Sequence, residues 1–346
     1  MGTECAYNSI AVVGTGGYGR HFISALLATR KFVRVRAVTR KTSDDAKRKR
    51  LQALQEMGAE IFEYKSSSTE SFKQAFNGIH TVISAVSIAA VPDQISMIDG
   101  AILANVQWFI PSEYGVAHYP SVWMPFTSPL APKTVVQKYL SDYAKPKGLS
   151  YTIVYTGLAL DYLDPKSLGL KLSTGSATLV GRGGSPVSFT AFPDVVSLVV
   201  NIVQRPAEMQ NRFIRFAGST TKMRELVKIV TNNDRGENVK IVCIEEAKSK
   251  FCELARRQDM SAFQIYSRLL IEEGLGQINR YREPLDNSLF PELHPEPIQQ
   301  TLRRLIKANE ATAKAKLKPN PAHRSATTKS VTDGLGRTQK QLDGED

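Results

Sequence analysis

The sequence predicts an α/β protein built on a doubly wound parallel sheet, with a smaller, mostly helical region toward its C-terminus. Two observations lead to this fold class. Apolar, β-branched runs alternate with helix-like segments through residues 1–156, a pattern typical of βαβ units. A glycine-rich loop, GTGGYGR at 14–20, separates the first apolar run from the first amphipathic segment. The length of 346 residues suits one large domain or two unequal ones.

Hydrophobic periodicity predicts the order of strands and helices along the chain. Strands are expected where short runs are apolar or β-branched, at 10–13, 33–38, 59–64, 81–88, 106–110 and 151–156. Helices are expected where apolar residues recur at helical spacing, at 21–30, 44–57, 68–77, 91–105 and 133–144. After Thr156 the pattern loosens into glycine- and serine-rich turns with short strand-like runs. A helix then returns at 192–204, followed by a strand at 211–218 that could complete the main sheet.

The glycine loop has the spacing G-x-G-x-x-G between a strand and a helix, which is the arrangement of a Rossmann-type dinucleotide site. Gly14 permits the tight turn, Gly16 lets the backbone approach a pyrophosphate, and Gly19 allows the helix to pack closely on the strand. The helix then directs its first N–H groups and its positive dipole end at the phosphates. The alternative is a glycine-rich turn that holds no ligand. The expected cofactor-binding positions of the loop are Gly14, Thr15, Gly16, Gly17, Tyr18 and Gly19.

The residue after the second strand indicates which dinucleotide is bound. NAD sites place a carboxylate there to accept from the ribose hydroxyl, but this strand ends in VTRK, with Arg40 and no acidic residue. A guanidinium suits the extra 2′-phosphate of NADPH. Lys47 or Lys49 on the following helix could close over the same phosphate, whereas Arg48 and Arg50 are interpreted as exposed helix charges. The sequence therefore predicts NADPH as cofactor.

Composition narrows the function further. The net charge is +12, but the basic residues concentrate between Arg30 and Arg50 and in the tail, without the interleaved aromatic residues that single-strand binders use. One phosphate explains this cluster better than nucleic acid does. The cysteines Cys5, Cys243 and Cys252 lie far apart, which favours reduced thiols and argues against a disulfide framework or a zinc site. No signal-peptide pattern and no membrane-spanning apolar run is present, so we expect a cytoplasmic protein. No H-x-H, paired-cysteine or carboxylate cluster suggests a metal site, so we expect no metal.

These features divide the chain into three parts. Residues 1–156 are expected to form the dinucleotide-binding Rossmann domain, with its sheet completed by 211–218. Residues 157–317 are expected to form the substrate-binding region, with helices at 221–232 and 245–258. Residues 318–346 are polar, lack aromatic residues and are interrupted by proline, so a disordered tail is expected there.

Three segments carry a resemblance to a known family: IPSEYG at 110–115, KTVVQKYLSDYAKPKGLSYTIVYTGLALDYL at 133–163, and DVVSLVVNIVQRPAEMQNRFIRFAG at 194–218. Their order and spacing resemble the NmrA-like, isoflavone-reductase-like group of the atypical short-chain dehydrogenases, and most closely its fungal CipA-type members. The similarity extends over about residues 8–310. It implies an NADPH-binding Rossmann domain followed by a small substrate domain.

The resemblance implies a catalytic lysine at the start of the helix after the fifth strand, and Lys133 occupies that position. It could give or take a proton near the nicotinamide, or hold a hydroxyl of the cofactor ribose. The alternative is a solvent-exposed lysine, which the helix macrodipole makes slightly unfavourable. Neither Tyr114 nor Tyr139 is followed by lysine four positions later, as typical short-chain dehydrogenases require, and Lys138 is interpreted as a surface residue.

Other candidate positions follow from the same resemblance. Ser84 and Val86 end the fourth strand, where the family's backbone passes the adenosine ribose. Ser112 follows the fifth strand beside the expected nicotinamide and could bond cofactor or substrate, or only cap the turn. Glu113 is interpreted as structural, and a lone histidine, His118, as a surface residue. The expected substrate contacts are Tyr114, Thr156, Gly157 and Phe189.

Two functions remain open at this stage. The first is an NADPH-dependent reductase that transfers hydride to a small, aromatic or polyketide-like secondary metabolite, with Lys133 managing the proton. The second is a redox sensor like NmrA itself, which binds a dinucleotide and regulates a transcription factor. Retention of Lys133 favours the enzyme, because a sensor need not keep it. The sequence leaves the oligomeric state open.

Overall fold

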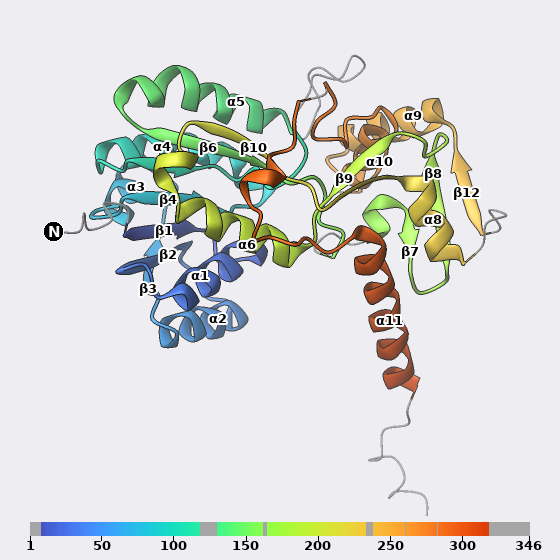
Figure 1. Ribbon diagram of the computed structural model, residues 1–346, viewed down its shortest axis with the longest axis horizontal. Coiled ribbons are helices and arrows are strands. Elements are labelled where there is room, and N and C mark those ends of the chain that lie inside the picture. Colours follow the sequence, from blue (N-terminus) through green and yellow to red (C-terminus); the bar gives the residue numbers. More distant parts are fainter. Residues whose placement is uncertain are drawn as a thin grey trace, which may run out of the picture.

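The computed structural model of the chain describes residues 8–117, 130–161, 165–232, 238–259, 261–281 and 283–317. The expectations for His118 and for the tail at 318–346 concern positions outside these residues. Figure 1 shows two parts side by side, a larger one built on the main sheet and a smaller one that carries α8 to α11. The chain passes between the two parts more than once.

The main sheet has seven strands in the order β10-β6-β5-β4-β1-β2-β3. All of its neighbouring strands are parallel, which confirms the predicted doubly wound fold class (Figure 1). The strand β10 lies at one edge, beside β6. The strands are β1 (Ser9–Val13), β2 (Arg34–Arg40), β3 (Glu60–Tyr64), β4 (Thr81–Ser84), β5 (Trp108–Ile110), β6 (Ser150–Tyr155) and β10 (Arg212–Arg215).

Helices cover both faces of this sheet because alternate strand residues are apolar on each side. On one face, Ile10 and Val12 of β1 belong to the core that includes α1, α2 and α6. On the other face, Ala11 and Val13 belong to the core that includes α3, α4 and α5. The helices are α1 (Gly17–Thr29), α2 (Asp45–Glu56), α3 (Thr69–Ala75), α4 (Gln94–Leu103), α5 (Ala131–Tyr139), α6 (Phe192–Val203) and the short α7 (Pro206–Met209).

Two elements differ from their predicted bounds near the expected site. The apolar run 81–88 is a strand only as far as Ser84, because the chain turns away after it and begins a 3-10 turn at Ile88–Asp93. The carbonyl oxygen of Val86 accepts a hydrogen bond from the Ser112 hydroxyl at 2.9 Å, which holds this turn against the end of β5. The expected strand 106–110 is reduced to Trp108–Ile110.

The C-terminal part contains two small sheets besides its helices. One has the order β12-β8-β7 and the other pairs β11 with β9. Separate apolar cores fill this part, one around α8 and α11 and one around α9 and α10. The elements are β7 (Leu170–Lys171), β8 (Ser176–Val180), β9 (Pro186–Phe189), β11 (Ser219–Lys222), β12 (Val239–Val242), α8 (Met223–Thr231), α9 (Ile244–Arg256), α10 (Ala262–Glu272) and α11 (Ile298–Leu317).

An ion cluster joins the start of α11 to the junction between the two parts. The Arg304 guanidinium lies 3.2 Å from the carboxylate of Asp161 and 2.9 Å from that of Glu296. The carboxylate of Asp194, in the first turn of α6, accepts a hydrogen bond from the Glu296 backbone N–H at 2.8 Å. Hydrogen bonding to Arg304 lowers the pKa of Glu296, whereas burial raises the pKa of Asp194.

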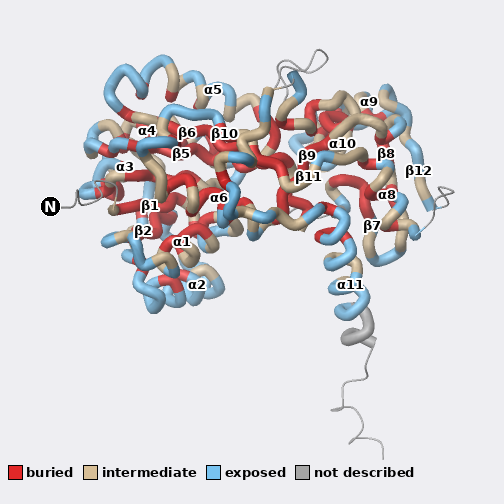
Figure 2. Tube along the Cα trace, in the orientation of Figure 1, coloured by how far each residue is buried: buried red, intermediate tan, exposed pale blue. Residues whose placement is uncertain are grey.

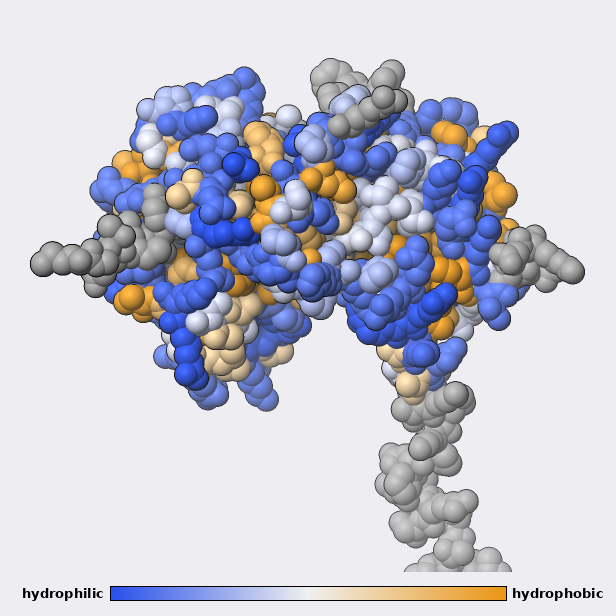
Figure 3. Space-filling view, viewed as in Figure 1, coloured by the Kyte–Doolittle hydropathy of each residue, from blue (hydrophilic) through white to orange (hydrophobic). Residues whose placement is uncertain are grey.

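The surface of the described residues is mixed in character. Figure 2 shows the buried residues concentrated in the sheet and in the middle of the smaller part, while residues 303–312 of α11 are exposed or intermediate. In Figure 3 the viewed face is mostly hydrophilic, with apolar side chains in separate small groups. Within the described ranges, no helix combines the length and apolar character needed to span a bilayer.

Candidate functional site

The glycine loop leads from β1 into α1 and has the backbone geometry that its spacing predicts. Gly14 has φ +99°, and a Cβ there would lie 2.6 Å from the carbonyl oxygen of Ala85. A Cβ on Gly19 would lie only 1.8 Å from the carbonyl oxygen of Gly14. A Cβ on Gly16 would have no atom within 4 Å. Two glycines are therefore required by packing, whereas Gly16 leaves open space beside the chain.

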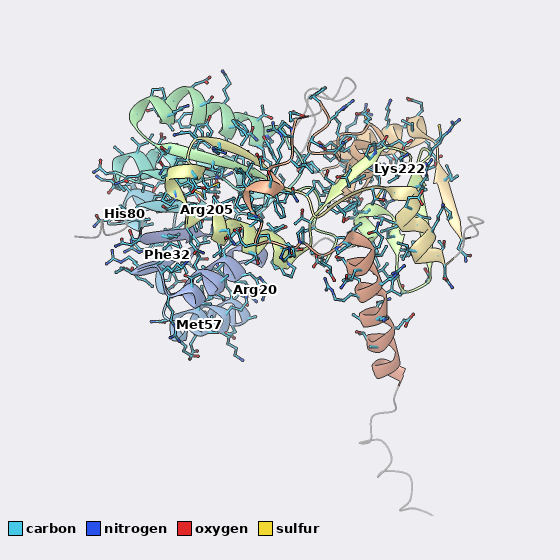
Figure 4. All side chains as sticks on the ribbon, viewed as in Figure 1. Arg20, Phe32, Met57, His80, Arg205 and Lys222 are labelled. Atoms are coloured by element: carbon cyan, nitrogen blue, oxygen red, sulfur yellow. The ribbon has the colours of Figure 1, made fainter. Side chains whose placement is uncertain are left out.

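The first turn of α1 offers unblocked N–H groups. Its N-cap residue is Gly16, no side chain caps it, and the first turn holds no acidic residue. By contrast, the carboxylate of Asp44 caps α2 and the hydroxyl of Ser68 caps α3. In Figure 4, Arg20 of this first turn lies nearer to the C-terminal part than Phe32 and Met57 do. An uncapped helix N-terminus that opens between the two parts suits an anionic ligand.

A cleft of about 400 Å³ runs along this loop. Arg40, at the end of β2, lines it together with Lys47 and Arg50 of α2. The Lys47 ammonium donates to the Arg40 carbonyl oxygen at 2.7 Å, and partial burial lowers the pKa of Lys47. The Arg40 guanidinium lies 3.4 Å from the carboxylate of Asp93. Three cations at one end of the cleft fit a terminal phosphate.

The basic residues of α2 that line the cleft differ in part from those expected from the sequence. Lys49 is exposed and does not line the cleft, because the helical turn of α2 directs its side chain elsewhere. Lys47, the other lysine considered, and Arg50, interpreted as a solvent charge, face the cleft instead. Positions 47 and 50 are three residues apart and so share one face of α2.

A second cavity, of about 360 Å³, lies beyond the carboxyl ends of β4 and β5. Its wall is mostly apolar and comes from both parts of the molecule, including Leu130, Leu158 and the α10 residues Phe263, Tyr266 and Leu270. Four residues line both this cavity and the glycine-loop cleft: Tyr18, Val86, Ser87 and Ser112. The two spaces therefore share a wall. We call the second one the apolar cavity.

Lys133 lies in the wall of the apolar cavity, at the third position of α5. Its Nζ donates to the backbone carbonyl oxygen of Glu113 at 2.7 Å and lies 3.4 Å from the Glu113 Oε2. The side chain of Lys133 is 12% exposed and that of Glu113 is 1% exposed. The expected catalytic lysine thus forms an ion pair with a buried carboxylate at the edge of the cavity.

The side chains of Gln137 and Tyr155 extend the Lys133–Glu113 pair into a hydrogen-bond chain that leads away from the cavity. The Gln137 side-chain amide donates to Glu113 Oε1 at 3.0 Å. The Tyr155 hydroxyl, at the end of β6, donates to the Gln137 amide oxygen at 3.0 Å. Sequence reasoning interpreted Glu113 as structural and did not single out Gln137. Their spacing supplies a partial signal, because Lys133 and Gln137 are four residues apart and share one helix face.

Tyr114 also lines the apolar cavity and has a strained backbone, with φ +27°. Its hydroxyl is buried and has no hydrogen-bond partner among the described residues. Burial and the neighbouring Glu113 charge raise the pKa of Tyr114 well above its ordinary value. Non-glycine residues with positive φ concentrate at functional sites, so this loop has the character expected of one.

The remaining candidates divide between the site and the core. Val86 and Gly157 line the apolar cavity. Ser112 lines both the cavity and the cleft, and its hydroxyl donates a hydrogen bond to the Val86 carbonyl oxygen. Ser84 is fully buried and its Oγ contacts the Met97 sulfur at 4.0 Å, because β4 is still paired there. Thr156 and Phe189 are also buried and line neither space.

Two Tyr-x-x-x-Lys spacings do occur, at Tyr143–Lys147 and at Tyr162–Lys166, and Tyr162 lies outside the described residues. The Lys147 ammonium lies 3.5 Å from the centroid of the Tyr143 ring. Both residues follow α5 at its far end and line neither the cleft nor the apolar cavity. This pair is therefore a surface contact, and the lysine at the cavity is Lys133.

Comparisons with known proteins agree with this geometry. The model of the NmrA-like family matches residues 7–319. A relative named oxidoreductase aprR, from Aspergillus flavus, is 30% identical over 210 residues, which cover 59% of this chain and 67% of the relative. Among solved structures, the NADPH complex of leucoanthocyanidin reductase from Vitis vinifera has a TM-score of 0.70 at 17% identity, covering 86% of this chain and 99% of that one.

An isoflavone reductase structure is similar to a comparable extent, with a TM-score of 0.68 at 18% identity, over 87% of this chain and 100% of that one. These low identities establish the shared fold, while the family match spans nearly the whole chain and includes the glycine loop, Glu113 and Lys133. The protein is thus a member of the NmrA-like family.

Proposed function

We propose that the protein is an NADPH-dependent reductase that transfers hydride to a small, aromatic or polyketide-like secondary metabolite, with Lys133 assisting the proton transfer. The observation that carries the proposal is the position of Lys133. Its ammonium lies in the wall of an apolar cavity that shares Tyr18, Val86, Ser87 and Ser112 with the glycine-loop cleft.

The cleft supplies the parts that NADPH requires. The open space at Gly16 and the uncapped start of α1 suit the pyrophosphate. Arg40, Lys47 and Arg50 suit the 2′-phosphate. The Vitis vinifera reductase of the same fold was solved with NADPH, which supports this assignment. When bound, NADPH supplies the hydride, which is the difficult part of the chemistry.

The apolar cavity suits a flat, hydrophobic substrate. Aromatic side chains from three elements or loops line it, namely Tyr18, Tyr114, Phe263 and Tyr266. Such rings favour stacked or edge-on contacts with an aromatic ligand, and about 360 Å³ is within the range of small-molecule sites. The apolar wall also excludes water from the reacting carbon.

Lys133 supplies the proton in this scheme. As hydride adds to an electrophilic carbon of the substrate, negative charge develops on the neighbouring atom. The Lys133 ammonium donates a proton to that atom, or stabilises its charge, and solvent then restores the proton. The name of the Aspergillus flavus relative, an oxidoreductase, supports a reductase over a binding protein without activity.

The test is NADPH oxidation with a panel of enones, imines, ketones and quinones. We expect turnover of at least one panel member by the wild type and a loss of about 10²–10⁴-fold in kcat for Lys133→Ala, with NADPH binding retained in calorimetry. Lys138→Ala is the matched control, because Lys138 lies on the same helix but is exposed and paired with Asp142. It should keep wild-type activity.

The sensor hypothesis predicts a different outcome. Tight NADPH binding without turnover of any panel member, together with specific capture of a transcription regulator, would favour a sensor like NmrA. The buried ion pair at the apolar cavity argues for the enzyme, because a sensor that reads only the dinucleotide has no need of a cation beside a substrate-sized space.

A further inference from the structure

We infer that Glu113 is the positioning residue of Lys133, holding the ammonium so that one of its N–H groups faces the apolar cavity. This inference rests on the proposed function, because it explains how the proposed proton donor is oriented. Glu113 follows β5, and Lys133 lies 20 positions later, in the first turn of α5. The fold brings them together at the edge of the cavity.

Lys133 Nζ makes one hydrogen bond and one ion pair, both with Glu113. It donates to the Glu113 backbone carbonyl oxygen at 2.7 Å, and it lies 3.4 Å from Glu113 Oε2 as an ion pair. Among the described residues, Glu113 Oε2 has no hydrogen-bond partner, so the charge of this buried oxygen is balanced by the nearby ammonium. Because an ammonium has three donors and the carbonyl oxygen takes one, an N–H group is available to a ligand in the cavity.

A second contact chain fixes the orientation of the Glu113 carboxylate. The Tyr155 hydroxyl donates to the Gln137 amide oxygen, so the Gln137 N–H₂ group must face the other way, toward Glu113 Oε1. One carboxylate oxygen is thereby held by Gln137, and the other is left for Lys133. Each hydrogen bond in this chain therefore points toward the carboxylate: Tyr155 donates to Gln137, and Gln137 donates to Glu113.

The backbone around Glu113 is fixed as well. Its N–H donates to the Pro111 carbonyl oxygen at 2.8 Å, closing a three-residue turn, and the next residue, Tyr114, has φ +27°. A strained loop of this kind persists only where its surroundings hold it. It presents both the carbonyl oxygen and the carboxylate of Glu113 to the same Nζ.

Chemical labelling of the full-length protein tests this role without a substrate. Acetic anhydride reacts with a lysine amine that it can reach, so a side chain whose Nζ is held against a carbonyl oxygen and a carboxylate reacts slowly. The acetylation rate of Lys133 is measured by peptide mass spectrometry and divided by that of Lys138 in the same sample. For Glu113→Gln, which keeps the shape but removes the ion pair that holds Nζ, we expect this ratio to rise about tenfold.

A second variant keeps the test valid if Glu113→Gln does not fold. Gln137→Leu leaves the carboxylate in place but removes the donor that fixes it, so the ratio should rise by a smaller factor, about threefold. Thermal unfolding shows that each variant is folded. A ratio that stays at the wild-type value in the folded variant overturns the role of Glu113.

Kinetics separate this inference from the proposed function. With a substrate from the panel, Glu113→Gln should lower kcat with little change in KM, because the Lys133 ammonium loses the carboxylate that holds it in place. A fall in stability without these changes would indicate a structural role for Glu113 alone. Full activity of Lys133→Ala would instead contradict the proposed function, whatever the labelling ratio.

Discussion

Glycines at 14, 16 and 19 share one motif but meet different physical constraints. A side chain at 14 or 19 would collide with backbone carbonyl oxygens, at 2.6 and 1.8 Å respectively. Gly16 faces open space and has a negative φ of −79°, so a methyl group there would meet no atom within 4 Å and no left-handed backbone. The motif therefore combines two glycines that packing requires with one, Gly16, that we propose leaves space for the dinucleotide.

This difference gives a prediction for matched alanine variants. Gly16→Ala should unfold at nearly the wild-type temperature yet bind NADPH more weakly, because its methyl group occupies the space left for the pyrophosphate. Gly19→Ala should lower the unfolding temperature as well, since the chain must move to admit the methyl group. Differential scanning calorimetry and NADPH titration measure the two effects. Equal loss of stability in both variants would contradict the assignment.

The proposed preference for NADPH also depends on a single side chain. Arg40→Ala should weaken NADPH binding by about 1–3 kcal/mol and leave NADH binding nearly unchanged, because only NADPH carries the 2′-phosphate. Calorimetric titration with both cofactors provides the comparison. An equal loss for NADPH and NADH would place Arg40 elsewhere on the dinucleotide.

Some site residues could be predicted from their neighbours along the chain. The glycine spacing between a strand and a helix predicts the loop, and the missing carboxylate after β2 points to Arg40; the structure places both in the lining of one cleft. Glu113 was interpreted as structural because its contact with Lys133 spans 20 residues and depends on how β5 and α5 meet. Which basic residues of α2 face the cleft depends on where the helix begins, at Asp45, and the spacing of basic residues alone does not fix that start.

At the scale of elements, the order of strands and helices in the main sheet was predictable from periodicity. The small sheets were not, because their strands are short and pair over long distances, as Val239 of β12 does with Ala177 of β8. The apolar run at 81–88 illustrates another limit. Its second half has strand-like composition, yet it turns away from the sheet to form the wall that both spaces share.

One buried hydrogen-bond chain connects three elements of the larger part. The Trp108 indole N–H of β5 donates to the Thr152 hydroxyl of β6 at 2.9 Å, and that hydroxyl donates to the Met209 carbonyl oxygen of α7 at 2.6 Å. Trp108 and Thr152 are fully buried. The Thr152 hydroxyl therefore provides a hydrogen-bond partner for both the Trp108 indole N–H and the Met209 carbonyl oxygen.

Thr152→Val should lower the free energy of unfolding by about 1–3 kcal/mol, because it keeps the shape of the side chain but removes both hydrogen bonds. Thr152→Ser is the control that retains the hydroxyl, and it should lose less. Urea unfolding of both variants gives the difference. A valine variant as stable as the wild type would mean that these bonds add nothing to the stability of the fold.

At the scale of the whole molecule, the junction cluster makes stability depend on pH in two opposite ways. Burial raises the pKa of Asp194 in the folded state, so its stabilising contribution is complete below the unfolded value of about 3.9 and is lost as the pH rises through the folded pKa. The pKa of Glu296 is lowered by Arg304. Its contribution is present above the unfolded value of about 4.3 and is lost as the pH falls through the folded pKa.

Two neutral variants should therefore move in opposite directions. Relative to the wild type, the melting temperature of Asp194→Asn should improve as the pH rises from acid to neutral. That of Glu296→Gln should worsen over the same range, because it lacks the carboxylate that Arg304 holds. Thermal melts at a series of pH values test both. Parallel curves for the two variants would show that the junction does not couple to protons in this way.

The wall common to the cleft and the apolar cavity has a kinetic consequence. Since Tyr18, Val86, Ser87 and Ser112 border both spaces, whatever fills the first compartment becomes part of the lining of the second. In the proposed reductase, the substrate-binding surface of the apolar cavity is therefore complete only after the nucleotide has bound in the cleft. Steady-state measurements should reveal a compulsory order of addition, with the nucleotide leading and its oxidised form leaving last.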